Sequence, residues 1–130
     1  MANVMNKIAP GFTQNSKIDA NHLSNDPSVC EAYVTDPLNH DKISVRLFSD
    51  FYAAGKWAIK NADKLPVETL LVHGADDAII SSHGTVEFTE NSKGLAKCKI
   101  FENTKHEPHN DKTHETLFSY TRSWLESRLD

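Results

Sequence analysis

The sequence predicts an α/β fold, and three features of the chain indicate it. A short apolar run at 67–72, bounded by Pro66 and Gly74, is typical of a buried strand. A second strand pattern covers 96–103, where Cys98 and Ile100 alternate with lysines. Helical patterns lie between and after these strands. The order strand, helix, strand, helix favours two parallel strands joined by a right-handed crossover.

Length and composition limit the classes of protein to which this chain can belong. A chain of 130 residues is expected to form one folding unit, and 38% hydrophobic with 25% charged residues fits a globular protein. The net charge of −4 gives no basic surface for a nucleic-acid partner. No apolar run approaches the ~18 residues of a transmembrane helix, and the first twelve residues lack the apolar core of a secretory signal.

The two cysteines, Cys30 and Cys98, are far apart and have no CxxC spacing. We therefore expect two free thiols in a reducing compartment and a cytoplasmic location.

The first part of the chain, 1–65, is expected to be a helical segment. Residues 1–23 are polar and are expected to be mostly irregular. Asp26-Pro27 combines an N-cap with a proline at the first helical position, which predicts that a helix begins there and continues to about residue 34. From Ser44 the apolar residues recur at helical spacing. They are Leu47, Phe48, Phe51, Tyr52, Trp57 and Ile59. The apolar stripe of Phe51, Tyr52 and Trp57 is expected to pack in a core; the alternative is a groove for an acyl chain.

The second part, 66–130, is expected to hold the strand–helix–strand–helix unit. The strands are predicted at 67–74 and 96–103, with a helix over 84–93 between them. The last helix is predicted from the pattern in 114–129. Its apolar face is predicted to comprise Leu117, Phe118, Thr121, Trp124, Leu125 and Leu129.

Polar residues follow both strands. Asp76 and Asp77 come after the first strand and His106 after the second, so an aspartate and a histidine should meet at one edge of the sheet. An aspartate that accepts a hydrogen bond from an imidazole leaves the other ring nitrogen free to act as a base. The alternatives are that the aspartates are turn or N-cap residues and that His106 is a solvated loop residue.

Other histidines allow other interpretations. A metal site could be built from His106, His109, Asp111 and His114, although Pro108 disfavours a helix there. We expect no metal and no cofactor. His73 and His83 are expected to be hydrogen-bonded polar residues without a catalytic role.

The stretches "HGADD" (73–77) and "HEPHND" (106–111), with "NDPSVCEAYVTDPL" (25–38) before them, resemble the C-terminal half of an α/β-hydrolase of the monoacylglycerol lipase and lysophospholipase branch. This resemblance implies a partial α/β-hydrolase fold, a helical lid followed by two parallel strands. It also implies that Asp77 and His106 are the catalytic acid and base of a serine hydrolase cleaving lipid-like carboxylic esters. One departure from the family is Asn103-Thr104 in place of a glycine-containing turn before the histidine.

The family's nucleophile lies in G-x-S-x-G, and no pair of the five glycines here brackets a serine at that spacing. We therefore expect the isolated chain to be inactive. It should pair with a complementary N-terminal half, or self-associate through an open sheet edge. The alternative is a truncated, catalytically incompetent relative that serves as an assembly or binding module.

Overall fold

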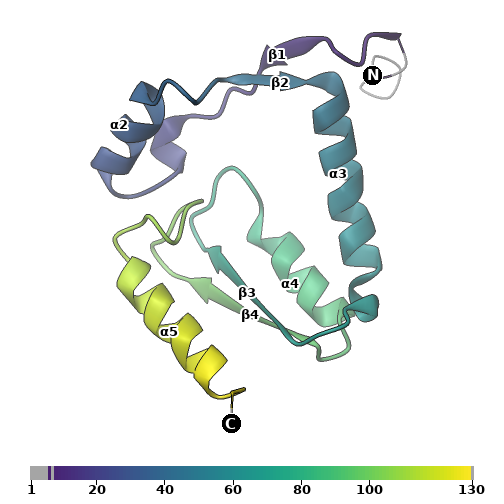
Figure 1. Cartoon of the computed structure of the whole chain (residues 1–130), viewed down its shortest axis with the longest axis vertical. Coiled ribbons are helices and arrows are strands. Elements are labelled where there is room, and N and C mark those ends of the chain that lie inside the picture. The colour runs from purple at the N-terminus through teal and green to yellow at the C-terminus, as the bar shows by residue number, and fades with distance from the viewer. Residues whose placement is uncertain (1–5, 7, 130) are drawn as a thin grey trace.

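The computed structural model of the protein describes residues 6 and 8–129. Figure 1 shows an upper part with β1, β2 and α2, a long helix α3 that descends from it, and a lower part where α4 and α5 flank the strands β3 and β4. The elements, with two short 3-10 helices, are β1 (Thr13–Asn15), η1 (Ala20–His22), α2 (Pro27–Thr35), β2 (Lys42–Ser44), α3 (Val45–Lys60), η2 (Ala62–Lys64), β3 (Thr69–Gly74), α4 (Ser82–Asn91), β4 (Ala96–Phe101) and α5 (His114–Glu126).

The lower part is a β–α–β–α unit. β3 pairs with β4 in parallel, in a register that runs from Thr69 opposite Ala96 to Gly74 opposite Phe101. The predicted parallel pair is therefore confirmed. Each of the two strands has one neighbour within the described residues. Because its other side is uncovered, β3 is half-buried from Thr69 to His73, and only its last residue, Gly74, is buried.

Side-chain caps fix where α2 and α3 begin. The Asp26 carboxylate accepts a hydrogen bond from the Ser28 amide, with Pro27 at the first helical position, and this confirms the predicted start of α2. Ser44 caps α3 in the same way by accepting from the Leu47 amide.

The expectation that 1–23 is mostly irregular is wrong in part; residues 1–5 and 7 lie outside the described residues. β1 pairs with β2 in an antiparallel register that places Gln14 opposite Ile43. Both strands are three residues long and largely polar, so they carry almost no period-2 hydrophobic pattern. The small sheet sets where α3 begins, because Ser44 ends β2 and also caps the helix.

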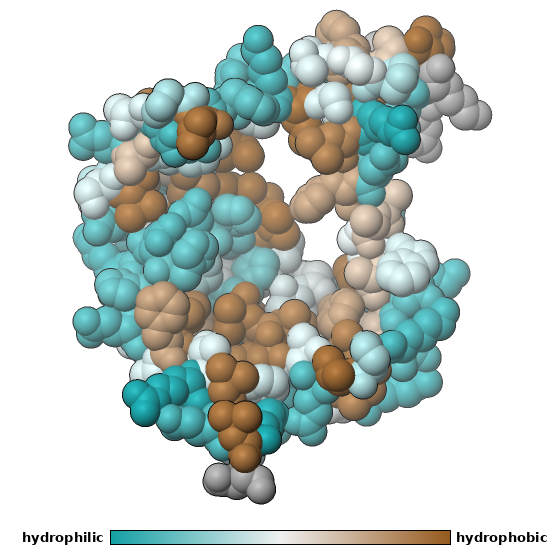
Figure 2. Space-filling view, in the orientation of Figure 1, coloured by the Kyte–Doolittle hydropathy of each residue, from teal (hydrophilic) through white to brown (hydrophobic). Residues whose placement is uncertain are grey.

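The apolar stripe of α3 is helical as predicted, but the expectation that it packs in a core is wrong for this chain. Phe51, Tyr52 and Trp57 are 63%, 59% and 67% exposed. Figure 2 shows hydrophobic residues gathered around an opening between the upper and lower parts. The hydrophobic residues that are buried are Leu23, Cys30, Ala62, Ala96, Phe101 and Leu117.

The last helix is also less covered than predicted. Leu117 is buried and Trp124 is half-buried, whereas Phe118, Leu125 and Leu129 are at least half exposed. Leu129 lies beyond the end of α5 at Glu126, so it does not share a helical face.

Cys30 and Cys98 are both free thiols, as predicted. Within the described part of the chain, no helix has the length and apolar character needed to cross a bilayer. The division at residue 65 stays a prediction, and contacts cross it: the Asn91 side chain on α4 donates to the carbonyl oxygen of Ile59 on α3.

Candidate active site

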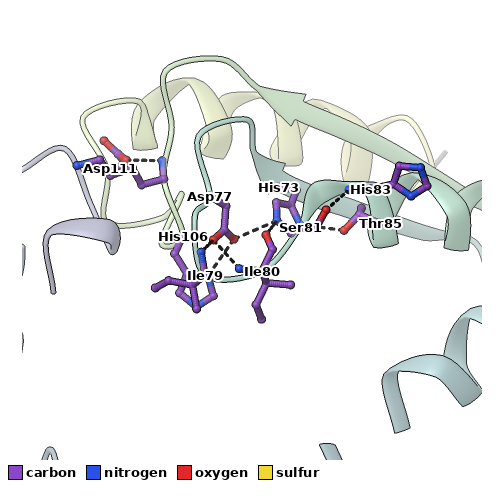
Figure 3. A network of polar contacts seen from close by, with 10 residues as sticks. His73, Asp77, Ile79, Ile80, Ser81, His83, Thr85, His106 and Asp111 are labelled. Atoms are coloured by element: carbon purple, nitrogen blue, oxygen red, sulfur yellow. Dashed lines mark hydrogen bonds and ion pairs between the residues drawn. The ribbon is translucent and has the colours of Figure 1, made fainter. Parts of the chain in front are cut away.

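The site lies where β3 and β4 end. Asp77 is in the turn after β3 and His106 in the loop after β4, and parallel pairing brings both to the same edge of the sheet. His106 Nδ1 lies 2.9 Å from Asp77 Oδ2 (Figure 3). The Asp77 side chain is 3% exposed and that of His106 is 29% exposed, so the carboxylate is enclosed while the imidazole reaches the surface.

Asp77 is also a turn residue, so two of the alternatives considered for it coexist. Its Oδ1 accepts hydrogen bonds from the amides of Ile79 at 2.8 Å and Ile80 at 2.9 Å. These bonds occupy one oxygen and leave Oδ2 directed at His106. The neighbouring Asp76 is exposed and plays a different part, since its amide donates to the carbonyl oxygen of Thr104.

The environment of Asp77 acts on its pKa in two directions. Burial on its own would raise the pKa, because it disfavours the charged carboxylate. The hydrogen bonds from Ile80, His106 and Ile79 outweigh burial and hold the pKa of Asp77 below its ordinary value. The carboxylate is therefore ionised at neutral pH and able to stabilise a positive charge on His106.

Gly74, the last residue of β3, lets the two loops come together. A Cβ atom at this position would collide with the carbonyl oxygens of Thr104 and Lys105. Those are main-chain atoms of the loop that carries His106, and they have no rotamer by which to move aside. A residue without a side chain is required here because the backbone approaches so closely.

The loop before His106 contains Asn103-Thr104 where the resemblance implied a glycine-containing turn. Asn103 has a φ of 52°, in the left-handed region that asparagine tolerates better than most residues. Thr104, which follows, is fully buried, and its hydroxyl bonds to Thr113 and to the carbonyl oxygen of Glu102. Asn103 therefore adopts a left-handed turn without glycine, and the buried Thr104 anchors it.

Asp111 fixes the far side of this loop. Its side chain is buried, with the residue 1% exposed. One carboxylate oxygen accepts from the Lys105 amide at 2.9 Å and from the Asn25 side chain at 3.3 Å, and the other accepts from the Lys112 amide at 2.7 Å. Asp111 thus holds the residue next to His106 in place.

The segment just before α2 holds the same loop from outside. The His106 amide donates to the carbonyl oxygen of His22, and the Glu107 amide donates to that of Leu23 at 2.8 Å. The Lys105 ammonium group adds hydrogen bonds to the carbonyl oxygens of Asn21 and Ser24. Residues 21–25 of the predicted lid segment are therefore joined to the histidine loop by main-chain bonds and by the side chains of Lys105 and Asn25.

His73 lies at the site as well, and the sequence did not reveal its part there. Its Nε2 is 3.0 Å from Asp77 Oδ2, the oxygen that also contacts His106. His73 is hydrogen-bonded, as expected, to the Thr85 hydroxyl and the carbonyl oxygen of Ile80, but the expectation did not include a contact with Asp77. A separation of four residues across the end of a strand does not by itself indicate that two side chains meet.

The metal interpretation finds no support in the geometry. His109 is exposed, and the His114 ring donates from Nδ1 to the carbonyl oxygen of Asp111 at 2.7 Å. The Asp111 carboxylate is directed at amide groups, and His106 at Asp77. Among residues 6 and 8–129, no three histidine, cysteine, aspartate or glutamate side chains are arranged so that they could hold a metal ion.

Comparisons with known proteins agree on one family. The model of the family described as "Serine aminopeptidase, S33" matches residues 1–113. An uncharacterized abhydrolase domain-containing protein of Dictyostelium discoideum is 28% identical over 100% of this chain and 14% of its own length. A monoacylglycerol lipase of Mycolicibacterium smegmatis is 28% identical over 99% of this chain and 46% of its own length.

Among solved structures, the monoacylglycerol lipase of Paleococcus ferrophilus superimposes with a TM-score of 0.90 at 29% identity. The match covers 97% of this chain and 50% of that one. The chain thus spans half or less of the length of each of these relatives.

Proposed function

This chain belongs to the serine aminopeptidase S33 family and carries part of the α/β-hydrolase fold, and from that premise we propose that it supplies the acid and base of a Ser–Asp–His triad. The proposed reaction is hydrolysis of a carboxylic ester of the monoacylglycerol or lysophospholipid type. The observation that carries the proposal is the contact of 2.9 Å between His106 Nδ1 and Asp77 Oδ2 at the carboxyl ends of two parallel strands.

The contact fixes the protonation needed for a base. Asp77 Oδ2 is an acceptor when the carboxylate is ionised, so His106 donates its proton from Nδ1 and leaves Nε2 free. Nε2 takes the proton of the serine hydroxyl as its oxygen attacks the ester carbonyl carbon. The imidazolium is stabilised by Asp77 and then protonates the leaving alkoxide. Water repeats the sequence on the acyl-enzyme and releases the carboxylic acid.

We propose that the nucleophilic serine and the oxyanion-hole amides come from residues outside these 130, since no G-x-S-x-G is present among them. Such a segment would add further strands at a free edge of the two-stranded β3–β4 sheet. The exposed apolar residues around the opening in Figure 2 would be covered by the same segment.

The ester class is proposed from the relatives and from α3. Two of the relatives reported above are monoacylglycerol lipases. The exposed Leu47, Phe48 and Phe51 on α3 present an apolar surface suited to an acyl chain.

Reconstitution tests this function. The chain is combined with a separate polypeptide that carries the G-x-S-x-G half of the fold; native mass spectrometry reports the complex, and release of fatty acid from a monoacylglycerol reports turnover. Turnover is expected only for the complex. His106→Ala should lower kcat by at least about 10³-fold. His109→Ala, at an exposed position in the same loop, is the matched control and should retain activity.

The second candidate function is an assembly or binding module without catalysis, which the exposed apolar residues favour. A stable complex that hydrolyses no ester would support the module. Equal turnover in His106→Ala and His109→Ala would rule out the role of His106.

A further inference from the structure

The carbonyl oxygens of residues 21–24, which run from η1 towards α2, form a row of hydrogen-bond acceptors. The two preceding carbonyl groups, of Asp19 and Ala20, close the turn of η1 itself. All four carbonyl groups that follow accept hydrogen bonds from residues 105–107. The histidine loop therefore lies along this row of main-chain oxygens.

Lys105 bonds to both ends of the row. Its ammonium group donates to the carbonyl oxygen of Asn21 at 2.7 Å and to that of Ser24 at 3.2 Å. An ammonium group has three N–H donors, and hydrogen bonds from a charged donor are stronger than those between neutral groups. The side chain thus spans the two carbonyl groups that receive the main-chain bonds of the loop.

The main-chain bond of His106 is the weakest contact in the row. Its amide nitrogen lies 3.4 Å from the carbonyl oxygen that it faces, beyond the roughly 2.7–3.2 Å of a typical N–H···O bond. The Glu107 amide, which follows, makes a bond of 2.8 Å, and the Lys105 ammonium, which precedes, makes one of 2.7 Å. The backbone of His106 is therefore held chiefly by the residues on its two sides.

The main chain of Lys105 is fixed as well. Its amide donates to the buried carboxylate of Asp111 at 2.9 Å. Lys105 is consequently held at both ends, and it links the segment before α2 to the residues before α5. A shift of its backbone would carry the next residue, His106, whose Nδ1 lies 2.9 Å from Asp77 Oδ2.

We propose that Lys105 is a positioning residue for His106: its ammonium group binds the carbonyl oxygens of Asn21 and Ser24 and thereby holds the imidazole at the distance from Asp77 that proton transfer requires. Lys105 contacts neither the ester nor the nucleophile in this scheme. Its effect on turnover rests on the proposed function, whereas its effect on the loop can be measured on the 130-residue chain alone.

The ammonium group itself gives the first measurement, by nuclear magnetic resonance of the unsubstituted chain labelled with nitrogen-15. An ammonium group bound to carbonyl oxygens exchanges its protons with water more slowly than a solvated one. Lys105 should therefore give a resolved Nζ signal under conditions where Lys112, which is exposed nearby in the sequence, gives none. Equally fast exchange at both lysines would overturn the proposal.

Two substitutions give the second measurement. Lys105→Met keeps the length of the stem and removes the donors, whereas Lys105→Arg keeps a cationic donor. In Lys105→Met, the amides of His106 and Glu107 should exchange with water at least about tenfold faster, and the imidazole resonances of His106 should shift, while the amides of β3 and β4 keep their rates. Lys105→Arg should stay close to the parent chain.

Lys112→Met is the matched control, since it makes the same change at an exposed lysine, and it should reproduce the parent chain. Faster exchange throughout the chain in Lys105→Met would assign Lys105 to overall stability and overturn its positioning role. Unchanged exchange of His106 and Glu107 would overturn it as well.

Kinetics follow from reconstitution with the separate polypeptide that carries G-x-S-x-G. In Lys105→Met, kcat should fall by about tenfold or more with KM little changed, because a displaced base loses alignment while ester contacts remain. Lys105→Arg should recover most of kcat, and an unchanged kcat in Lys105→Met would contradict the positioning role. A complex that hydrolyses no ester would refute the proposed function, while the ammonium signal and amide exchange still decide whether Lys105 holds the loop.

Discussion

The amide of Asp76 donates a hydrogen bond of 2.9 Å to the carbonyl oxygen of Thr104, and this bond ties the turn of Asp77 to the loop of His106. A second bond, from the Ala75 amide to the carbonyl oxygen of Phe101, extends the β3–β4 ladder by one residue. The separation of acid and base is therefore set by the backbone as well as by their own side chains. Substitutions that shift either loop should change activity without touching the two residues.

Gly74→Ala is the sharpest test of that coupling. The added methyl group collides with main-chain oxygens of Thr104 and Lys105, so the histidine loop must move away from β3. We expect a loss of about 1–3 kcal/mol in the free energy of unfolding and a large fall in turnover. Denaturant unfolding and the ester assay measure the two effects.

The control for this substitution is Gly55→Ala in the middle of α3, where a Cβ atom meets nothing within 4 Å. There the change should stabilise the protein by up to about 1 kcal/mol, because alanine is the better helix former. Equal effects of Gly74→Ala and Gly55→Ala would contradict the close approach at Gly74.

Asp77→Asn should abolish most activity while Asp76→Asn should not. The side-chain amide of asparagine carries no negative charge, so it does not stabilise the imidazolium as the carboxylate does. It can also donate a hydrogen bond to His106 Nδ1, which favours the tautomer with the proton on Nε2. A fall of about 10⁴-fold in kcat is expected by analogy with other triads. Asp76 is exposed and acts through its main chain, so its substitution should leave kcat nearly unchanged.

Asp77 should contribute to the pH dependence of the free energy of unfolding. Its pKa in the folded protein lies below the ordinary value of 3.8, so the unfolded chain binds the proton more readily. The stabilisation that the ionised Asp77 carboxylate gives the folded protein is complete above pH 3.8. It is lost as the pH falls through the lower pKa that Asp77 has in the folded protein. Exposed aspartates with lowered pKa values, such as Asp19, remain in both proteins and cancel in the comparison.

Asp77→Asn should therefore lose less stability than the parent protein as the pH falls below 3.8. Denaturant unfolding at a series of pH values measures the difference. Parallel curves for the two proteins would show that Asp77 contributes nothing to acid sensitivity.

Asp111→Asn tests the support of the histidine loop. The asparagine amide would bring an N–H group against the amide of Lys105 or of Lys112, both of which need an acceptor. We expect a cost of about 1–3 kcal/mol in stability and reduced turnover. Glu115→Gln, exposed in the first turn of α5, removes a negative charge nearby and should change neither quantity.

Much of the fold was predictable because local chemistry determines it. Asp26-Pro27 marked the start of α2, and the apolar run at 67–72 marked a parallel strand. The resemblance to monoacylglycerol lipase-like α/β-hydrolases is confirmed by the family match and the solved structure. The pairing of β1 with β2 was not predictable, because two three-residue strands with Ile43 as their one apolar residue carry no periodicity.

Periodicity also says which face of a helix is apolar but not what covers it. Phe51 and Trp57 therefore looked like core residues although they are exposed. At the site, the order of the strands placed an aspartate and His106 at one sheet edge, and the family resemblance selected Asp77 over Asp76. The contact of His73 with Asp77 depends on side-chain directions at the end of β3, which no spacing rule supplies. The catalytic roles of Asp77 and His106 stay predictions.

The hydrogen bonds from the His106 loop to His22 and Leu23 have a consequence for protein engineering. They join main-chain atoms, so they place no demand on the side chains that occupy these positions. Chimaeras that exchange the helical lid after residue 26 between relatives should keep the histidine loop in place, provided residues 21–25 are retained, since the side chains of Ser24 and Asn25 also bond to the loop. Exchanges that cut within 21–25 would separate the loop from its support, whatever amino acids are introduced.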